Sequence, residues 1–202
     1  MNIDIEAVKK RIDIINFKQV ELLKIALTHP SYVYEITELT RQQQEEQERD
    51  YRRLAHLGDA IINAIVTDYL LKYRSDLNKD HLTKLKQKLV NRKQLAEFAQ
   101  ELNLRQICLL GGSEKGKEQD EYKDHFGEMF EALLGAIYLE FERNFSNTGS
   151  WLIEHFIKEA VDDLFDNESK DDFDENVEEL DWRSAIDDDL LIWYYEYADN
   201  SD

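Results

Sequence analysis

Apolar residues recur every three to four positions along almost the whole chain up to about residue 160, and no sustained two-residue alternation interrupts them. This spacing is that of amphipathic helices, each with one buried face. A single proline and many Leu, Ala, Glu, Lys and Gln residues favour helices in the same way. The pattern therefore predicts an all-α domain.

Breaks in the pattern predict where the helices begin and end. Pro30 is expected to stop the second helix, and residues 109–123 are expected to form a loop. The polar stretch 41–50 has two interpretations, a solvated helical extension or a mobile loop, and we favour a surface role without special chemistry for it. The expected helices cover about 5–12, 18–27, 50–74, 80–90, 92–102, 124–141 and 149–165.

Two of these helices are strongly apolar and yet contain acidic residues. Glu128 and Glu131 are three positions apart, which places them on one helix face. Asp59 follows Gly58 in the earlier apolar helix, and we expect no Lys or Arg to be equally well placed in either segment. If the three acids converge, a Mg²⁺ ion would offset their repulsion. Gly58 would then mark a close approach of another helix. For each acid alone, a surface position or a salt bridge is the alternative.

A basic segment, residues 79–93, supplies a further candidate feature. Helical spacing puts Lys84, Lys88 and Arg92 on one stripe, and leucines occupy another face. Such a stripe is often only a solvated face. Beside a carboxylate-bound metal, it indicates a track for a phosphodiester backbone.

Charge is distributed unevenly along the 202 residues, whose formal net charge is −19. Residues 159–202 hold 18 acidic and 2 basic side chains, a net of −16, so residues 1–158 have a net of −3. We therefore expect a domain at 1–158 and an acidic extension at 159–202, with the composition of a disordered chain up to about 181. Residues 190–195 are apolar and aromatic. They could dock on the preceding domain, help the extension compete with a phosphodiester backbone for the basic segment, or recruit a basic protein partner.

The remaining composition bears on the compartment. The single Cys108 cannot form an internal disulfide and is expected to be a buried thiol, which favours a reducing compartment. No run approaches the ~18 apolar residues of a membrane span, and the first residues do not resemble a secretory signal. We expect a cytoplasmic protein with no membrane partner.

Five blocks of sequence, in order and at matching spacing, resemble the catalytic domain of ribonuclease III. They are ALTHPSY (26–32), LAHLGDAIIN (54–63), the segment 82–104, LLGG (109–112) and EMFEALLGAIYLE (128–140). The resemblance implies a two-fold dimer of all-α endonuclease domains that cleaves double-stranded RNA with Mg²⁺, which Mn²⁺ can replace, and leaves 5′ phosphates. Asp59 and Glu131 match the motif acids, and Glu128 matches a position that is usually aspartate. Lys84, Lys88 and Arg92 would contact the phosphates of the RNA. The cleavage would serve RNA maturation.

The sequence also departs from the family pattern. Ala55 stands where a carboxylate is usual, and His56 replaces an aromatic residue that helps to seal the dimer. We expect His56 to be a dimer contact, with a metal-ligand role as the minority alternative. Mini-ribonuclease III enzymes resemble this chain in having alanine there and remain nucleases, whereas organelle-ribosome relatives have lost catalytic acids.

Nothing in 159–202 resembles the double-stranded-RNA-binding domain of most bacterial members. The grip on RNA is therefore expected to come from the catalytic dimer or from a partner. A catalytically impaired RNA-binding or ribosome-associated protein is the alternative function.

Overall fold

The computed structural model describes residues 3–74, 77–115 and 123–168. Within these ranges the chain is helical, and its pairing of extended segments is a single bridge between Thr28 and Leu109. The predicted all-α class is confirmed. The elements are α1 (Ile5–Arg11), α2 (Val20–Ala26), α3 (Pro30–Val33), α4 (Arg41–Tyr73), α5 (Lys79–Leu89), α6 (Arg92–Glu101), α7 (Leu104–Ile107), α8 (Gly112–Lys115), α9 (Lys123–Glu140), α10 (Phe145–Leu152), η1 (Ile153–Ile157) and α11 (Lys158–Glu168).

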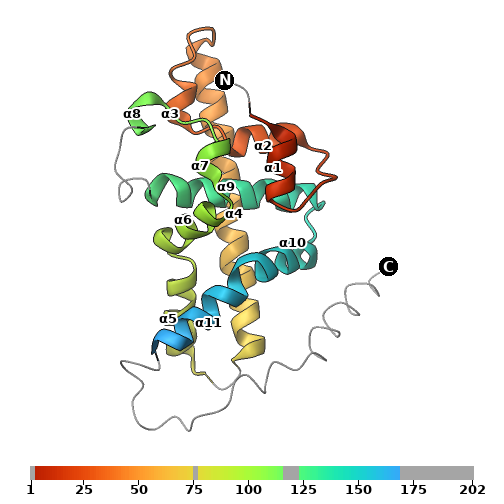
Figure 1. Cartoon of the computed structure of the whole chain (residues 1–202), viewed down its shortest axis with the longest axis vertical. Coiled ribbons are helices and arrows are strands. Elements are labelled where there is room, and N and C mark those ends of the chain that lie inside the picture. The colour runs from red at the N-terminus through yellow and green to blue at the C-terminus, as the bar shows by residue number, and fades with distance from the viewer. Residues whose placement is uncertain (1–2, 75–76, 116–122, 169–202) are drawn as a thin grey trace.

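Helix α4 runs along the length of the molecule, and α9 crosses it near the middle (Figure 1). The side-chain oxygen of Thr40 accepts from the amide of Gln43, and the Gln43 side chain accepts from the amide of Thr40. This capping box starts the helix at the polar stretch 41–50. The helical extension is therefore confirmed, and the loop interpretation is wrong.

By length and composition alone, α4 could cross a membrane. However, 50% of its most apolar window is buried inside the fold, as expected for a core helix. Ile62, Val66 and Leu70 on this helix are almost completely buried.

Two glycines set the crossing of α4 and α9. A Cβ on Gly58 would lie 1.8 Å from the carbonyl oxygen of Glu131, and a Cβ on Gly135 would lie 2.3 Å from the carbonyl oxygen of Leu54. Real Cβ atoms never come so close, so each helix needs its glycine. The close approach predicted for Gly58 is confirmed. It fixes the position of Asp59, on one helix, relative to Glu131, on the other.

A third glycine sets the contact between α9 and α6. A Cβ on Gly127 would lie 2.9 Å from the carbonyl oxygen of Arg92. Further along, Phe98, Phe130 and Phe156 pack ring against ring, with centroids 5.0–5.5 Å apart. This cluster joins α6, α9 and η1 in the core.

The last part of the described fold differs from its prediction. Helix structure begins at Phe145, not near 149, and contains a π-helical turn, η1. The indole nitrogen of Trp151 donates to the carbonyl of Ile12 over 2.7 Å, which ties α10 to the end of α1. The helical run continues through the expected domain boundary at 158, and Ala160 is buried. Residues 169–202, with the apolar segment 190–195, lie outside the described residues.

Two sequence blocks far apart in the chain pair with each other. The amide of Leu109 donates to Leu27, and the amide of His29 donates to Leu109. Pro30 is the first residue of α3, and α2 ends earlier, at Ala26, so the expectation that Pro30 stops α2 is wrong. Proline suits the first position of a helix because an amide hydrogen there would have no acceptor within the helix, so proline loses no hydrogen bond. Cys108, expected to be buried, is only half-buried.

Candidate active site

An open cavity of about 440 Å³ lies where α4, α9 and the junction of α5 and α6 meet. The structure brings all three acids of the sequence analysis, Asp59, Glu128 and Glu131, to this pocket. Its lining consists of Arg52, Ala55, His56, Asp59, Val90, Asn91, Arg92, Glu128 and Glu131. We call it the acid pocket.

Glu131 is the acid most affected by its surroundings. Burial raises its pKa to about 7, and the charges of Asp59 and Glu128 act in the same direction. The positive charge of Arg92 opposes the rise. A carboxyl with such a pKa holds its proton more readily than a solvated one, because its charged form is poorly solvated and repelled. A cation in the pocket would reverse both effects.

Asp59 is exposed at the mouth of the pocket and is held by its own helix. The amide nitrogen of Asn63 donates to Asp59 Oδ1 over 2.9 Å and to its backbone oxygen over 2.8 Å. Asn63 therefore limits the rotation of the carboxylate. Sequence reasoning did not identify this role, although a spacing of four positions on a helix was the signal for it.

Glu128 contacts an arginine. Arg52 Nη1 lies 3.4 Å from Glu128 Oε1, and Arg52 Nε donates to Glu48 Oε1 over 2.8 Å. The expectation that no cation is equally well placed is therefore wrong, since Arg52 and Arg92 both line the pocket. The signal for Arg52 was its position seven residues before Asp59, which is two helical turns on the same face.

The donor set fits a hard divalent cation only in part. Among the described residues, no three His, Cys, Asp or Glu side chains are arranged to hold a metal ion as they stand. Mg²⁺, however, is usually bound through one or two carboxylates together with waters and phosphate oxygens. Asp59 and Glu131 provide such a pair. Glu128 would act through water or move from Arg52.

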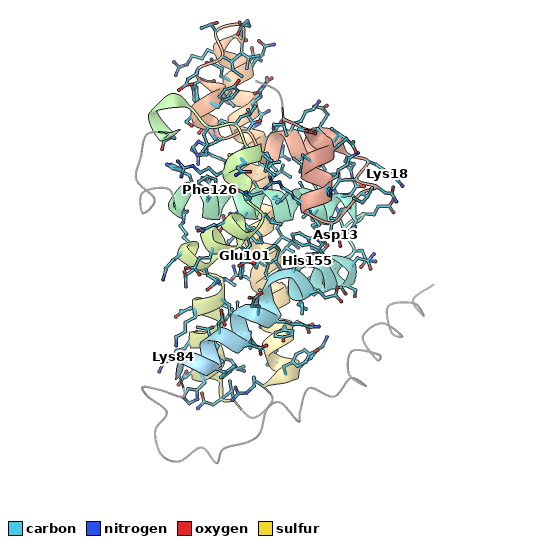
Figure 2. The ribbon with its side chains drawn as sticks, viewed as in Figure 1. Asp13, Lys18, Lys84, Glu101, Phe126 and His155 are labelled. Carbon is cyan, nitrogen blue, oxygen red and sulfur yellow. The ribbon has the colours of Figure 1, made fainter. Side chains whose placement is uncertain are left out.

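The basic stripe is divided between two helices. Lys84 and Lys88 are exposed on α5, which ends at Leu89, whereas Arg92 begins α6 after the cap Asn91. The prediction of one continuous stripe is therefore wrong for Arg92. Figure 2 shows Lys84 near the lower end of the molecule, far below Phe126 at the start of α9. Arg92, in contrast, lines the acid pocket.

An aromatic layer lies behind the pocket. Tyr51 on α4 packs edge-on against His29, and His29 packs against His125 on α9 with ring centroids 4.7 Å apart. The hydroxyl of Tyr51 is buried and has no hydrogen-bond partner among the described residues. Burial raises its pKa well above its usual value, and the charges of Glu128 and Glu131 add to the rise. Tyr51 thus lies close enough to Glu128 and Glu131 for their charges to act on its hydroxyl.

His56, the expected dimer contact, is exposed on α4. It lines the acid pocket and also a second open hollow of about 670 Å³ on the same helix. The residues of this hollow are Glu45, Glu48, Arg49, Arg52, Arg53, His56, Leu57 and Ala60.

Comparison with known proteins relates the sequence and fold of this chain to ribonuclease III. The Ribonuclease-III-like family profile matches residues 19–159. A ribonuclease 3 of Syntrophomonas wolfei is 33% identical over 153 residues, which is 76% of this chain and 59% of that protein. A ribonuclease 3 of Listeria monocytogenes is 35% identical over 62% of this chain and 52% of its own length. The chain thus spans little more than half the length of these relatives.

Solved structures agree with the sequence matches. A nuclease domain of ribonuclease III from Campylobacter jejuni, in which a region involved in dimer formation is flexible, is 28% identical. It superposes with a TM-score of 0.60 over 77% of this chain and 97% of that domain. A second structure of that domain, at 2.2 Å, is 27% identical with a TM-score of 0.59 over 85% of this chain and 99% of its own.

Proposed function

This chain belongs to the ribonuclease-III-like family, and from that premise we propose that it is a Mg²⁺-dependent endoribonuclease that cleaves double-stranded or structured RNA in RNA maturation. The observation that carries the proposal is the meeting of Asp59 and Glu131 in one pocket, where the pKa of Glu131 is raised to about 7 by burial and by neighbouring acids. Such a site attracts a divalent cation, because metal binding removes the repulsion between the carboxylates.

Each pocket residue has a separate task in this proposal. Asp59 and Glu131 would hold the Mg²⁺ or Mn²⁺ ion directly, and Glu128 would complete the shell, through water. When bound, the ion supplies an activated water and stabilises negative charge on the phosphoryl oxygens. Asn63 keeps Asp59 oriented by its 2.9 Å hydrogen bond. Water would add to phosphorus as the bond to the 3′ oxygen breaks. One proton of the water would pass to the 3′ oxygen, which leaves as a hydroxyl, and the downstream strand would keep a 5′ phosphate.

Positive side chains would bind the rest of the RNA backbone. Arg92 faces the acid pocket, and Lys84 and Lys88 lie on the exposed side of α5. We propose that these residues contact phosphates successively further from the cut. Contacts of this kind are independent of sequence and weaken as salt is raised.

A homodimer would give the duplex two pockets, one for each strand. The exposed face of α4 around His56, with its hollow of about 670 Å³, supports an interface there. We propose His56 as a contact across it. The same proposal includes a cytoplasmic location. It also includes a basic protein partner for the acidic extension, which is supported only by the charge of residues 159–202.

A second candidate function is RNA binding without cleavage. Two observations favour it: Ala55 lines the pocket with no carboxylate, and Arg52 contacts Glu128, one of the three acids. A protein of this kind would bind duplex RNA and leave it intact with every divalent metal.

Incubation of the full chain with 5′-labelled duplex RNA and Mg²⁺ tests the proposal. We expect cleavage that Asp59→Asn and Glu131→Gln each reduce by about 100-fold or more, since a catalytic metal contributes several kcal/mol. Asp68→Asn is a matched control on the same helix, because Asp68 pairs with Lys72 outside the pocket. The contrary result would be RNA that stays intact with both Mg²⁺ and Mn²⁺ over a range of salt, at protein concentrations that bind it. That result would favour the second function, RNA binding without cleavage.

A further inference from the structure

Arg52 is the least expected member of the acid pocket. It lies on α4 two turns before Asp59, so its side chain shares a face with that acid. Its guanidinium lies between two carboxylates, 2.8 Å from Glu48 and 3.4 Å from Glu128. The shorter contact is a strong charge-assisted hydrogen bond, and the longer one is weak. The side chain is 58% exposed in the single chain, and it lines both the acid pocket and the hollow around His56.

A relay of side chains fixes the orientation of this guanidinium. The hydroxyl of Tyr34, at the end of α3, donates to Glu48 Oε2, while Arg52 Nε donates to Glu48 Oε1. These two hydrogen bonds hold the pKa of Glu48 below its usual value. Glu48 therefore stays charged and holds Nε of Arg52 on one side, while Nη1 reaches toward Glu128 in the acid pocket.

The charges of the pocket limit how many cations it can hold. Its lining has three carboxylates and two guanidiniums, a formal charge of −1. One divalent cation turns this charge positive, before any RNA is bound. A second would have to share Glu128 with Arg52, and like charges a few ångströms apart repel strongly at a half-buried site. One of the guanidiniums is instead suitably placed to bind the anion that reacts.

We propose that Arg52 binds the phosphodiester at the acid pocket, oriented by Glu48, and supplies positive charge beside a single resident divalent cation. This inference rests on the proposed function. A planar guanidinium suits the role because two of its N–H groups match two phosphate oxygens. Arg52 contacts the substrate, whereas Glu48 and Tyr34 are positioning residues that act through it.

RNA binding measured without cleavage gives the first test. Fluorescence anisotropy of labelled duplex RNA, in Ca²⁺ and at several salt concentrations, compares wild type with Arg52→Gln. We expect the variant to bind about tenfold more weakly, with a salt slope reduced by about 0.9 for each pocket that contacts the duplex. Arg52→Lys should restore the charge but only part of the affinity.

A matched control and a second variant keep this test specific. Arg41 pairs with Glu45 on the same helix at 3.0 Å, outside the acid pocket, so Arg41→Gln should leave affinity and slope unchanged. Glu48→Gln leaves the charge of Arg52 in place and should weaken binding less than Arg52→Gln does. Thermal melts of each variant would check that the fold is retained.

Mn²⁺ binding followed by electron paramagnetic resonance gives the second test. We expect one Mn²⁺ per wild-type chain at the pocket, and equal or tighter binding in Arg52→Gln, together with cleavage at least tenfold slower. The opposite role would be that Arg52 merely neutralises Glu128. Tighter Mn²⁺ binding, faster cleavage and an unchanged salt slope in Arg52→Gln would establish that role and overturn the proposal, as would two Mn²⁺ ions in the wild-type pocket.

The two hypotheses can fail separately. If the wild type never cleaves but Arg52→Gln lowers both affinity and slope, the endonuclease proposal fails while the phosphate contact stands. If the wild type cleaves and Arg52→Gln changes neither affinity nor slope, the contact fails while the nuclease function stands.

Discussion

At the scale of single residues, Glu131 connects the fold to the proposed chemistry. Its helix is held against α4 by glycine contacts, so the backbones that carry Glu131 and Asp59 are fixed relative to each other. The result is a pKa of about 7, caused first by burial and then by the charge of Asp59. Such a group is half protonated near neutral pH.

The pH dependence of stability and metal binding follows from this residue. Because the folded-state pKa lies above the ordinary value, the stability that protonated Glu131 contributes is full below about pH 4.5 and is lost as pH rises through about 7. A metal ion binds the ionised form. We therefore expect Mg²⁺ to raise the unfolding temperature more at pH 8 than at pH 6, as measured by thermal denaturation.

Two variants test whether Glu131 causes this pH dependence. Glu131→Gln should lose most of the Mg²⁺ effect at both pH values. Glu101 also has a raised pKa through partial burial, but it ends α6 outside the acid pocket. Glu101→Gln should therefore keep the Mg²⁺ effect. An equal Mg²⁺ shift at pH 6 and pH 8 in the wild type would contradict a role for the Glu131 proton.

Sequence reasoning located the acids but not the residues that hold them. Asp59, Glu128 and Glu131 stand out because a charge inside an apolar pattern is unusual. Arg52 and Asn63 do not, although both share a face of α4 with Asp59, because neither is a charge within the apolar pattern. Their roles depend on where Glu48 and Asp59 point, and a periodic pattern does not contain that information.

At the scale of helices, the crossing of α4 and α9 determines the site. The two glycines contact the opposite backbones at Glu131 and Leu54, so the helices meet backbone to backbone. Sequence alone indicated this for Gly58, because a glycine costs about 1 kcal/mol in a helix and calls for a reason. The same cost applies to Gly135 inside α9, but the sequence pattern does not show which helix it contacts.

Gly58→Ala should therefore damage both stability and the site. The new methyl group would lie 1.8 Å from a backbone oxygen that cannot rotate away. We expect a loss of about 3 kcal/mol in the free energy of unfolding, measured by urea denaturation, and a loss of RNA cleavage, since Asp59 moves relative to Glu131.

Gly112→Ala is the control for this substitution. A Cβ on Gly112 would be 3.6 Å from its nearest neighbour, an ordinary contact. Its effect on stability should be within about 0.5 kcal/mol. If Gly58→Ala were equally harmless, the close crossing described for α4 and α9 would be wrong.

Helix boundaries were harder to predict than the helices themselves. Residues 41–50 have no apolar periodicity, so the pattern could not separate a helix from a loop. Thr40 and Gln43, which form the capping box, were the sequence signal for a helix that begins there. The π-helical turn η1 was not predictable, because one extra residue in a turn changes the apolar spacing too little to be recognised.

At the scale of the whole molecule, charge is the property that sequence alone describes best. Residues 1–158 have a net charge of −3, yet a basic segment lies beside the acid pocket through Arg92. Of the 18 acidic residues in 159–202, five lie on α11 and 13 lie outside the described residues. Counting the acidic residues needs only the sequence, whereas placing them relative to the acid pocket needs the structure.

Removal of residues 169–202, all outside the described part, tests whether they compete with RNA. This truncation keeps α11 and deletes 13 acidic and 2 basic residues, a net of −11. Competition predicts that RNA affinity rises on the order of tenfold at low salt and that the gain shrinks as salt screens the charges. Fluorescence anisotropy at two salt concentrations measures both. Equal affinity before and after truncation would exclude competition and leave two hypotheses, docking of residues 190–195 on their own subunit and recruitment of a basic protein partner.

The π-helical turn η1 has a consequence for how this chain tolerates deletions. A π turn takes up one residue more than an α turn of the same reach, so it accommodates that residue without turning the helix that follows. Deleting a single residue from 153–157 would allow a regular α turn to form there and would leave α11 on the same face, with Ala160 in the core and Phe165 beneath Arg74. A single deletion inside α11 would instead rotate the residues after it by about 100° around the axis. We therefore expect the chain to tolerate the loss of one residue better within η1 than within α11.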